Sequence, residues 1–252
     1  MRRILIAGCV ALMAFSGGCA QNKYRRSSAE AYYENAQKAL RDGKCYPAEL
    51  LFRNMLMDYP GSNLTDDAQF GLGQASQCRK EYLVAIFEFE RLLNEYPVSP
   101  YAAAARFQIG ESYFKQARDI HHDQEETLKS IQEFTRFVED YPKSDLVDDA
   151  EARVLELQNQ LAMKDVEIAH NYLKWGYTVS AKLYSEDIIE KYAGTPAALE
   201  AQFVIARVKV KTRDIEGALN DLTLLSGQDM VPGLKKKVIE LTMRLQKENQ
   251  KK

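Results

Sequence analysis

Several features that would place this chain in other structural classes are absent from its sequence. Glycine and proline are scarce, at 13 and 7 of 252 residues. No stretch alternates apolar and polar residues as a half-buried β-strand would. The net charge of −2 lacks the basic excess that nucleic-acid binding requires. The composition therefore favours an all-α chain and argues against a nucleic-acid partner.

Long hydrophobic runs are missing as well. The longest, Ile4 to Phe15, is too short to span a bilayer, and it follows Arg2 and Arg3. Three small residues then lead to Cys19. This order is typical of a bacterial lipoprotein signal peptide over residues 1–18, after which Cys19 would be lipidated.

Two residues near Cys19 bear on the type of signal peptide and on where the protein is anchored. Ser16 stands where a leucine is usual three places before the cysteine, and an ordinary secretory signal is the alternative. Ala20, where an aspartate would resemble an inner-membrane retention signal, points to lipid anchoring on the periplasmic face of the outer membrane. Residues 19–28 are polar and basic, and we expect a flexible tether there.

A pattern of small and large residues organises the rest of the chain. In residues 66–97, Gly73 and Ala85 are small, Phe89 is large, and Pro97 closes the segment. The pattern predicts two antiparallel helices packed at close range, because small residues let backbones approach and proline cannot continue a helix. One such hairpin cannot bury its own apolar face, so the pattern should repeat.

The pattern does repeat, at intervals close to those of the tetratricopeptide unit of about 34 residues. We therefore predict a right-handed α-solenoid of five tetratricopeptide-like hairpins and a C-terminal capping helix, with repeats 1–3 in residues 29–142. Residues 143–252 would hold a long helix, repeats 4 and 5, and the cap. The five units begin near Ala29, Asp66, Ala103, Ala162 and Leu199.

The second half begins with an unusually long apolar pattern. Asp145 to Tyr172 is expected to form one extended helix that joins the two halves of the molecule. Trp175, in the turn that follows, is interpreted as a packing residue. Leu234 to Lys252 is basic and amphipathic and is expected to cap the solenoid.

The third repeat carries an insertion of about eight residues between its two helices, near Arg118 to Glu126. His121 and His122 lie in it, but adjacent histidines point in different directions and no cysteine is near. We expect a solvated loop without a metal, and no cofactor elsewhere.

Cys9 would leave with the signal and Cys19 would carry lipid, which leaves Cys45 and Cys78. An exported compartment is oxidising, so a remaining pair is expected to form a disulfide. The repeat register places both on the same edge of the stack. Two separate buried thiols are the alternative.

The fifth position of each first helix tends to face the concave side of such a solenoid. Aromatic residues occupy it in the N-terminal half, and polar residues follow four places later on the same face. An aromatic strip with amide edges suits an extended apolar peptide; the alternative is that the rings fill space between first helices. The candidate groove residues are Tyr33, Gln37, Phe70, Gln74, Phe107, Glu111 and Phe114.

No nucleophile–base pair, phosphate loop or metal-ligand spacing is found, so no catalytic residue is predicted. Acidic pairs such as Asp66-Asp67 stand where helices start, and stabilisation of the helix dipole explains them. The sequence predicts a binding scaffold and not an enzyme.

The chain resembles the BamD (YfiO-type) family of outer-membrane β-barrel assembly lipoproteins. The more specific similarities are the Tyr-Pro endings at Pro60, Pro97 and Pro142, the enlarged third repeat, and residues 165–176. The resemblance implies a scaffold that binds the periplasmic domains of the barrel-forming subunit, accessory lipoproteins and unfolded outer-membrane proteins.

One departure concerns the second helix of repeat four. The family commonly has an arginine there that meets the barrel-forming subunit, whereas this chain has Tyr184. A different envelope scaffold, of the Tol-Pal or polysaccharide-export kind, is the alternative, because a solenoid fold does not fix function.

Overall fold

The structure is a computed structural model that describes residues 28–249, so the signal segment and Cys19 lie outside the described residues. Within that range all regular structure is helical, which confirms the prediction of an all-α helical-repeat solenoid. The helices are α1 (Ala29–Arg41), α2 (Cys45–Asp58), α3 (Thr65–Cys78), α4 (Tyr82–Glu95), α5 (Ala102–Phe114), α6 (Glu125–Asp140), α7 (Val147–Trp175), α8 (Thr178–Lys191), α9 (Pro196–Lys211), α10 (Ile215–Ser226) and α11 (Pro232–Asn249).

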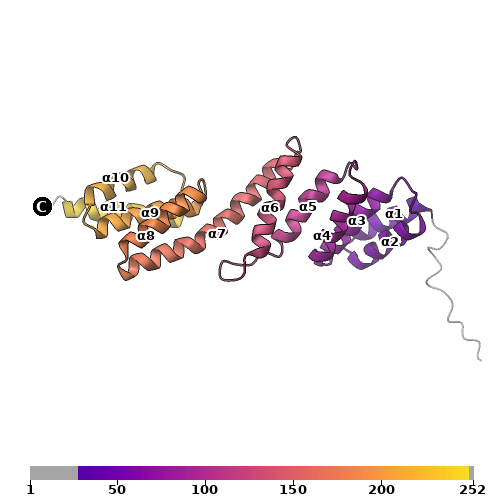
Figure 1. Ribbon diagram of the computed structural model, residues 1–252, viewed down its shortest axis with the longest axis horizontal. Helices are drawn as coiled ribbons and strands as arrows, with labels where there is room; N and C mark the ends of the chain where they lie inside the picture. Colours follow the sequence, from indigo (N-terminus) through magenta and orange to yellow (C-terminus); the bar gives the residue numbers. More distant parts are fainter. Residues whose placement is uncertain (1–27, 250–252) are drawn as a thin grey trace, which may run out of the picture.

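Consecutive helices pack as hairpins, and each hairpin packs on the next (Figure 1). Helices α1 to α6 stack at the N-terminal end, and α8 to α11 form a second group at the other end. Helix α7 runs obliquely between the two groups, so the molecule is elongated. The expected boundary between residues 142 and 143 falls in the loop between α6 and α7.

At three places in the N-terminal half a glycine lies directly against a buried phenylalanine ring of a neighbouring helix. A Cβ atom on Gly73 of α3 would lie 2.5 Å from the ring of Phe89 in α4. Phe89 is fully buried. A small residue is therefore required at position 73 for α3 to contact the Phe89 ring, because displacing a buried ring in a packed core costs free energy. The same relation joins Gly71 to Phe52 and Gly110 to Phe134.

Helix α7 is a single continuous helix of 29 residues that belongs to both groups. Its first turns pack through Ala150 and Val154 against Phe134 and Phe137 of α6. Its last turns pack against α8 and α9, through Val166 and Leu173 among others. It ends at Trp175, three residues beyond the expected Tyr172, and is capped by Gly176, whose φ of 95° suits a residue without a Cβ.

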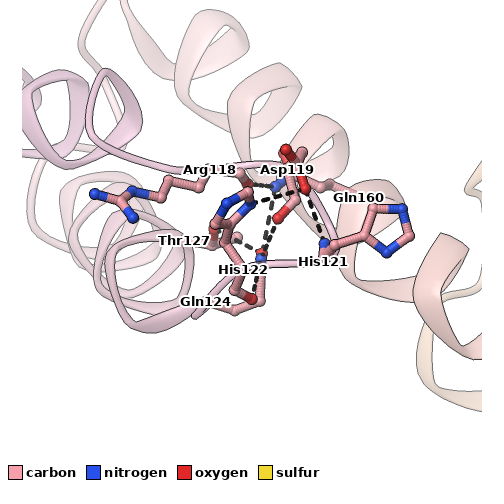
Figure 2. Close-up of polar contacts among 7 residues, drawn as sticks. All are labelled: Arg118, Asp119, His121, His122, Gln124, Thr127 and Gln160. Carbon is pink, nitrogen blue, oxygen red and sulfur yellow. Dashed lines mark hydrogen bonds and ion pairs between the residues drawn. The ribbon is translucent and has the colours of Figure 1, made fainter.

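The inserted loop after α5 is folded on itself and braced against α7 (Figure 2). The Asp119 carboxylate accepts a hydrogen bond from the His121 backbone N–H at 2.9 Å and contacts His122 Nδ1 at 3.0 Å. Gln124 Nε2 donates to the Asp119 carbonyl at 2.7 Å. Gln160 of α7 donates to the Arg118 carbonyl and, at 3.3 Å, to Gln124 Oε1, so the loop supports the middle of the long helix.

Replacing Gly73 by valine tests the glycine–phenylalanine contact. We expect a loss of roughly 1–3 kcal/mol or more in the free energy of unfolding, because the added methyl groups overpack a buried ring. The control is Gly233→Val in α11, where a Cβ meets nothing within 4 Å. Urea denaturation of the two variants measures the difference. Equal midpoints would contradict this account of the packing.

Candidate functional site

The aromatic residues of the predicted groove lie against the second helix of their own hairpin. Ring centroids are 6.0 Å apart for Tyr33 and Phe52, and 5.5 Å apart for Phe70 and Phe89. Phe107 packs on α6 at 5.3 Å from Phe134 and is only 8% exposed. Each of these rings therefore packs within its own hairpin. Phe70 also stacks on Tyr101, at the start of the next hairpin's first helix, with centroids 4.9 Å apart, which is the packing that the alternative of filling space between first helices expects.

The groove residues line two separate hollows and not one continuous strip. Tyr33 and Gln37 line a hollow of about 520 Å³ on α1, where Gln37 Nε2 donates to the Tyr33 hydroxyl at 3.2 Å. Phe107 and Glu111 line another of about 410 Å³ between α5 and α7. The two residues on α3, Phe70 and Gln74, line neither hollow.

Glu111 and Phe114 are both engaged by Arg153 of α7. The Arg153 guanidinium lies 4.3 Å from the centroid of the Phe114 ring, and its Nε donates to Glu111 at 2.8 Å. Burial alone would lower the pKa of Arg153, but its bonds to Glu111 and Glu156 hold it above the usual range. These contacts tie α5 to α7, so a peptide in this hollow would have to share them.

Cys45 and Cys78 are brought together and joined by a disulfide, with Cα atoms 5.6 Å apart. Cys45 begins α2 and Cys78 ends α3, so the bond links the first hairpin to the second. Within residues 28–249, no group of three or more His, Cys, Asp or Glu side chains is arranged to hold a metal ion. None of the described helices combines the length and apolar character needed to cross a bilayer.

A cluster of exposed aromatic residues lies where α7 turns into α8, and the sequence interpretation missed it. Trp175 and Tyr177 are 65% and 61% exposed, and Tyr184 is 39% exposed. All three rings surround Tyr172, with centroids 6.3, 6.3 and 5.3 Å away respectively. We call these four residues the α7–α8 corner. The interpretation of Trp175 as a packing residue is corrected, because most of its surface faces solvent.

Helix α8 also presents aliphatic side chains to solvent near this corner. Val179 and Leu183, which are 72% and 61% exposed, are four residues apart and so lie on one face of the helix. Exposed apolar side chains gathered on one helix face are a common feature of protein interaction sites. The sequence signal that could have revealed this surface is the apolar pair Val179 and Leu183, four residues apart, next to the four aromatic residues near the turn at Gly176.

These features define the class of the protein: a helical-repeat scaffold with exposed aromatic surface. The sequence matches the family described as "YfiO: Outer membrane lipoprotein" over residues 25–215. The chain belongs to this family.

Several relatives are named outer membrane protein assembly factor BamD. That of Caulobacter vibrioides is 28% identical over 200 residues, which cover 79% of this chain and 66% of the relative. That of Rickettsia prowazekii is 24% identical, with 60% of this chain and 61% of the relative covered. This chain therefore spans just under two thirds of the length of these two relatives. That of Haemophilus influenzae is 23% identical, with 81% and 83% covered. The name describes assembly factors, in agreement with the prediction of a non-catalytic scaffold.

Solved structures with helical repeats are more distant. A thermophilic TPR protein of Thermus thermophilus aligns at 14% identity and a TM-score of 0.38, over 84% of this chain and 98% of its own. The TPR domain of P58(IPK) aligns at 11% identity and a TM-score of 0.42, over 89% and 67%. The fold assignment therefore rests on the described helices themselves.

Replacing Phe107 by alanine tests whether the groove rings are core. Because Phe107 is buried against Phe134 and Phe137, we expect the free energy of unfolding to fall by roughly 3–5 kcal/mol. The control is Phe87→Ala in α4, a ring that is 61% exposed and should change stability little. Urea denaturation measures both. If the Phe107→Ala variant were as stable as the control, Phe107 would not be a core residue and would again be a candidate contact for a peptide.

Proposed function

We propose that this chain is a non-catalytic lipoprotein scaffold of the outer-membrane β-barrel assembly machinery. It is held on the periplasmic face of the outer membrane by lipid on Cys19. It binds the periplasmic domains of the barrel-forming subunit, accessory lipoproteins and unfolded outer-membrane proteins. The family match and the relatives named as assembly factors support this proposal.

The α7–α8 corner is the observation that carries the proposal. Aromatic side chains supply large contact area at low entropic cost and dominate the energetics of protein interfaces. Trp175 ends α7 and Tyr177 directly precedes α8; both rings lie against Tyr172, and both are more than half exposed. Exposed aromatic surface of this kind is stabilised when a partner protein covers it and removes it from water.

The contact made by this corner would be apolar. Tyr184 stands where the family commonly carries an arginine that meets the barrel-forming subunit. Its ring lies 5.3 Å from that of Tyr172, and it is 39% exposed. Burial of these rings would therefore replace the ion pair of the family, and the interface should depend only weakly on salt.

The two hollows on the N-terminal half suit segments of an unfolded client. The hollow on α1 pairs Tyr33 with Gln37, and such a pair can hold an extended chain through one apolar side chain and one backbone hydrogen bond. The hollow between α5 and α7 offers the charged side chains of Glu111 and Arg153 beside the buried Phe107 ring.

A crosslinked pull-down from cell envelopes tests the proposal. The full-length chain should recover the barrel-forming subunit, and a Trp175→Ala, Tyr184→Ala double variant should recover about tenfold less, since interface aromatics carry most of the binding energy. The double variant should unfold at nearly the same urea concentration as the native chain, because Trp175 is mostly exposed.

The matched control for the pull-down is Phe87→Ala, which removes a similarly exposed ring from α4. It should recover the barrel-forming subunit as the native chain does. Recovery of Tol or polysaccharide-export components in place of the barrel-forming subunit would overturn the proposed function. Equal recovery of the barrel-forming subunit by the double variant and the control would show that the α7–α8 corner is not part of the interface.

A further inference from the structure

The turns of the first two hairpins form one continuous edge at the N-terminal end of the solenoid, in the part built from α1 to α4 (Figure 1). The disulfide joins Cys45, at the start of α2, to Cys78, at the end of α3, with Cα atoms 5.6 Å apart. Each cysteine lies next to the turn of its own hairpin, so the bond holds the two turns side by side. We call residues 41–46 and 79–83 the disulfide edge.

Two apolar side chains project from the disulfide edge into solvent. Tyr46 is 62% exposed and Leu83 is 70% exposed. They occupy the same place in their repeats, as the second residue of α2 and of α4. The Arg79 guanidinium lies 5.2 Å from the centroid of the Tyr46 ring. Apolar side chains set among cations are the composition of surfaces that lie in a membrane interface.

Basic side chains outnumber acidic ones along this edge. The basic residues are Arg41, Lys44, Arg79 and Lys80, and the acidic ones are Asp42 and Glu81. Lys44 contacts Asp42 at 3.2 Å, and Arg79 pairs with Glu81 at 2.7 Å and with the buried Glu49. Among residues 28–249, no acid forms an ion pair with Arg41 or Lys80. The exposed surface of the edge therefore carries an excess of positive charge.

The opposite edge of the same two hairpins has the reverse charge. Residues 54–70, which end α2 and begin α3, contain no lysine or arginine. Three aspartates lie in this range and accept hydrogen bonds from tyrosine or serine hydroxyls: Asp58, Asp66 and Asp67. Glu95, at the end of α4, pairs with Arg91 at 2.8 Å. Hydroxyl partners leave the aspartate charges in place, so the two hairpins have a positive edge and a negative edge.

A lipid surface suits the disulfide edge better than a protein partner does. Stable protein interfaces bury about 800 Å² on each partner, and lysine is depleted from their cores. Two apolar side chains set among basic residues meet neither condition. An anionic bilayer attracts nearby lysines and arginines, and lysine can place its aliphatic stem along apolar surface while its ammonium group reaches a phosphate.

The length of chain before α1 allows such a contact. From Cys19 to Ala29 the chain can span at most about 35 Å. Helix α1 has 13 residues and is about 20 Å long. The disulfide edge lies at the far end of α1 from Ala29, because the turn to α2 follows Arg41. A lipid on Cys19 therefore leaves enough chain for this edge to lie on the same bilayer.

We propose that the disulfide edge lies on the anionic phospholipid headgroups of the membrane that anchors the chain. Lys44 and Lys80 contact lipid phosphates, and Tyr46 and Leu83 enter the interface beside them. The lipid anchor provides the affinity and the edge sets the orientation, with the acidic edge turned away from the anionic surface. The inference rests on the proposed function in one respect: it takes lipid on Cys19 to hold the chain at the membrane.

Fluorescence quenching in lipid vesicles tests the proposal. The lipidated chain is reconstituted into vesicles of phosphatidylethanolamine and phosphatidylglycerol, with an NBD fluorophore on one introduced cysteine. Leu83→Cys places the label at the disulfide edge. Asn94→Cys is the matched control, because it is exposed on the same face of α4 near the acidic edge. Cys45 and Cys78 are bonded to each other and do not take the label.

We expect lipids with a nitroxide in the headgroup region to quench the label at position 83 about threefold more strongly than the label at position 94, because three helical turns separate the two labels by about 16 Å. Urea denaturation of both labelled chains should give the native midpoint, since both positions are exposed.

A second comparison tests the role of charge. Lys44→Gln with Lys80→Gln should reduce quenching of the position-83 label about threefold, because each lysine near an anionic surface adds to the attraction. Vesicles of phosphatidylcholine alone should give the same reduction. The control, Lys235→Gln with Lys236→Gln, removes the same charge from exposed positions of α11 and should leave quenching unchanged.

Equal quenching at positions 83 and 94 would overturn the proposal, and so would quenching at position 83 that the Lys44→Gln, Lys80→Gln variant leaves unchanged. Shielding of position 83 only when envelope proteins are added would also overturn it, since a protein would then be the partner.

Failure of the proposed lipid anchor gives a different result. A chain purified from envelopes that does not float with the vesicles would contradict lipid on Cys19 and not the disulfide edge. The same labels are then compared in a chain held on nickel-chelating lipid by an N-terminal hexahistidine tag, and the same outcomes decide the proposal.

Discussion

The close approach of neighbouring helices at a small residue is the constraint on which this structure depends. In the N-terminal half a phenylalanine ring lies against a glycine, as Phe89 does against Gly73. In the C-terminal half fully buried alanines, such as Ala169 and Ala206, take the glycine's place in the pattern. Because each hairpin contacts only its neighbours, this local contact sets the rotation from unit to unit. The exposed surfaces described above follow from that rotation.

Helix α7 converts two short stacks into one molecule. It shares a core with α6 at its start and with α8 and α9 at its end, while the folded loop around Asp119 and Gln124 supports its middle through Gln160. The length of α7 also decides where the aromatic corner lies. The helix continues to Trp175 and then turns at Gly176, which carries that ring beyond the packed part of the hairpin and into solvent.

The sequence was sufficient for features that depend on local periodicity. The hairpins, their small–large contacts, and the position of Cys45 and Cys78 on one edge all repeat at fixed spacing, so a single register places them. The exposure of Trp175 could not be predicted, because it depends on three additional residues of helix. The groove rings were placed on the correct helices, but whether they face a neighbour or solvent depends on side-chain packing across the hairpin.

Hydrogen–deuterium exchange of the chain, alone and bound to the periplasmic domains of the barrel-forming subunit, tests the central claim most directly. The claim is that the aromatic corner between α7 and α8 is a docking surface held at a fixed place by the long helix. Amides of residues 172–184 should exchange more slowly in the complex, while those of α1 to α4 should be unchanged. Protection confined to α1 to α4, with none over residues 172–184, would contradict it.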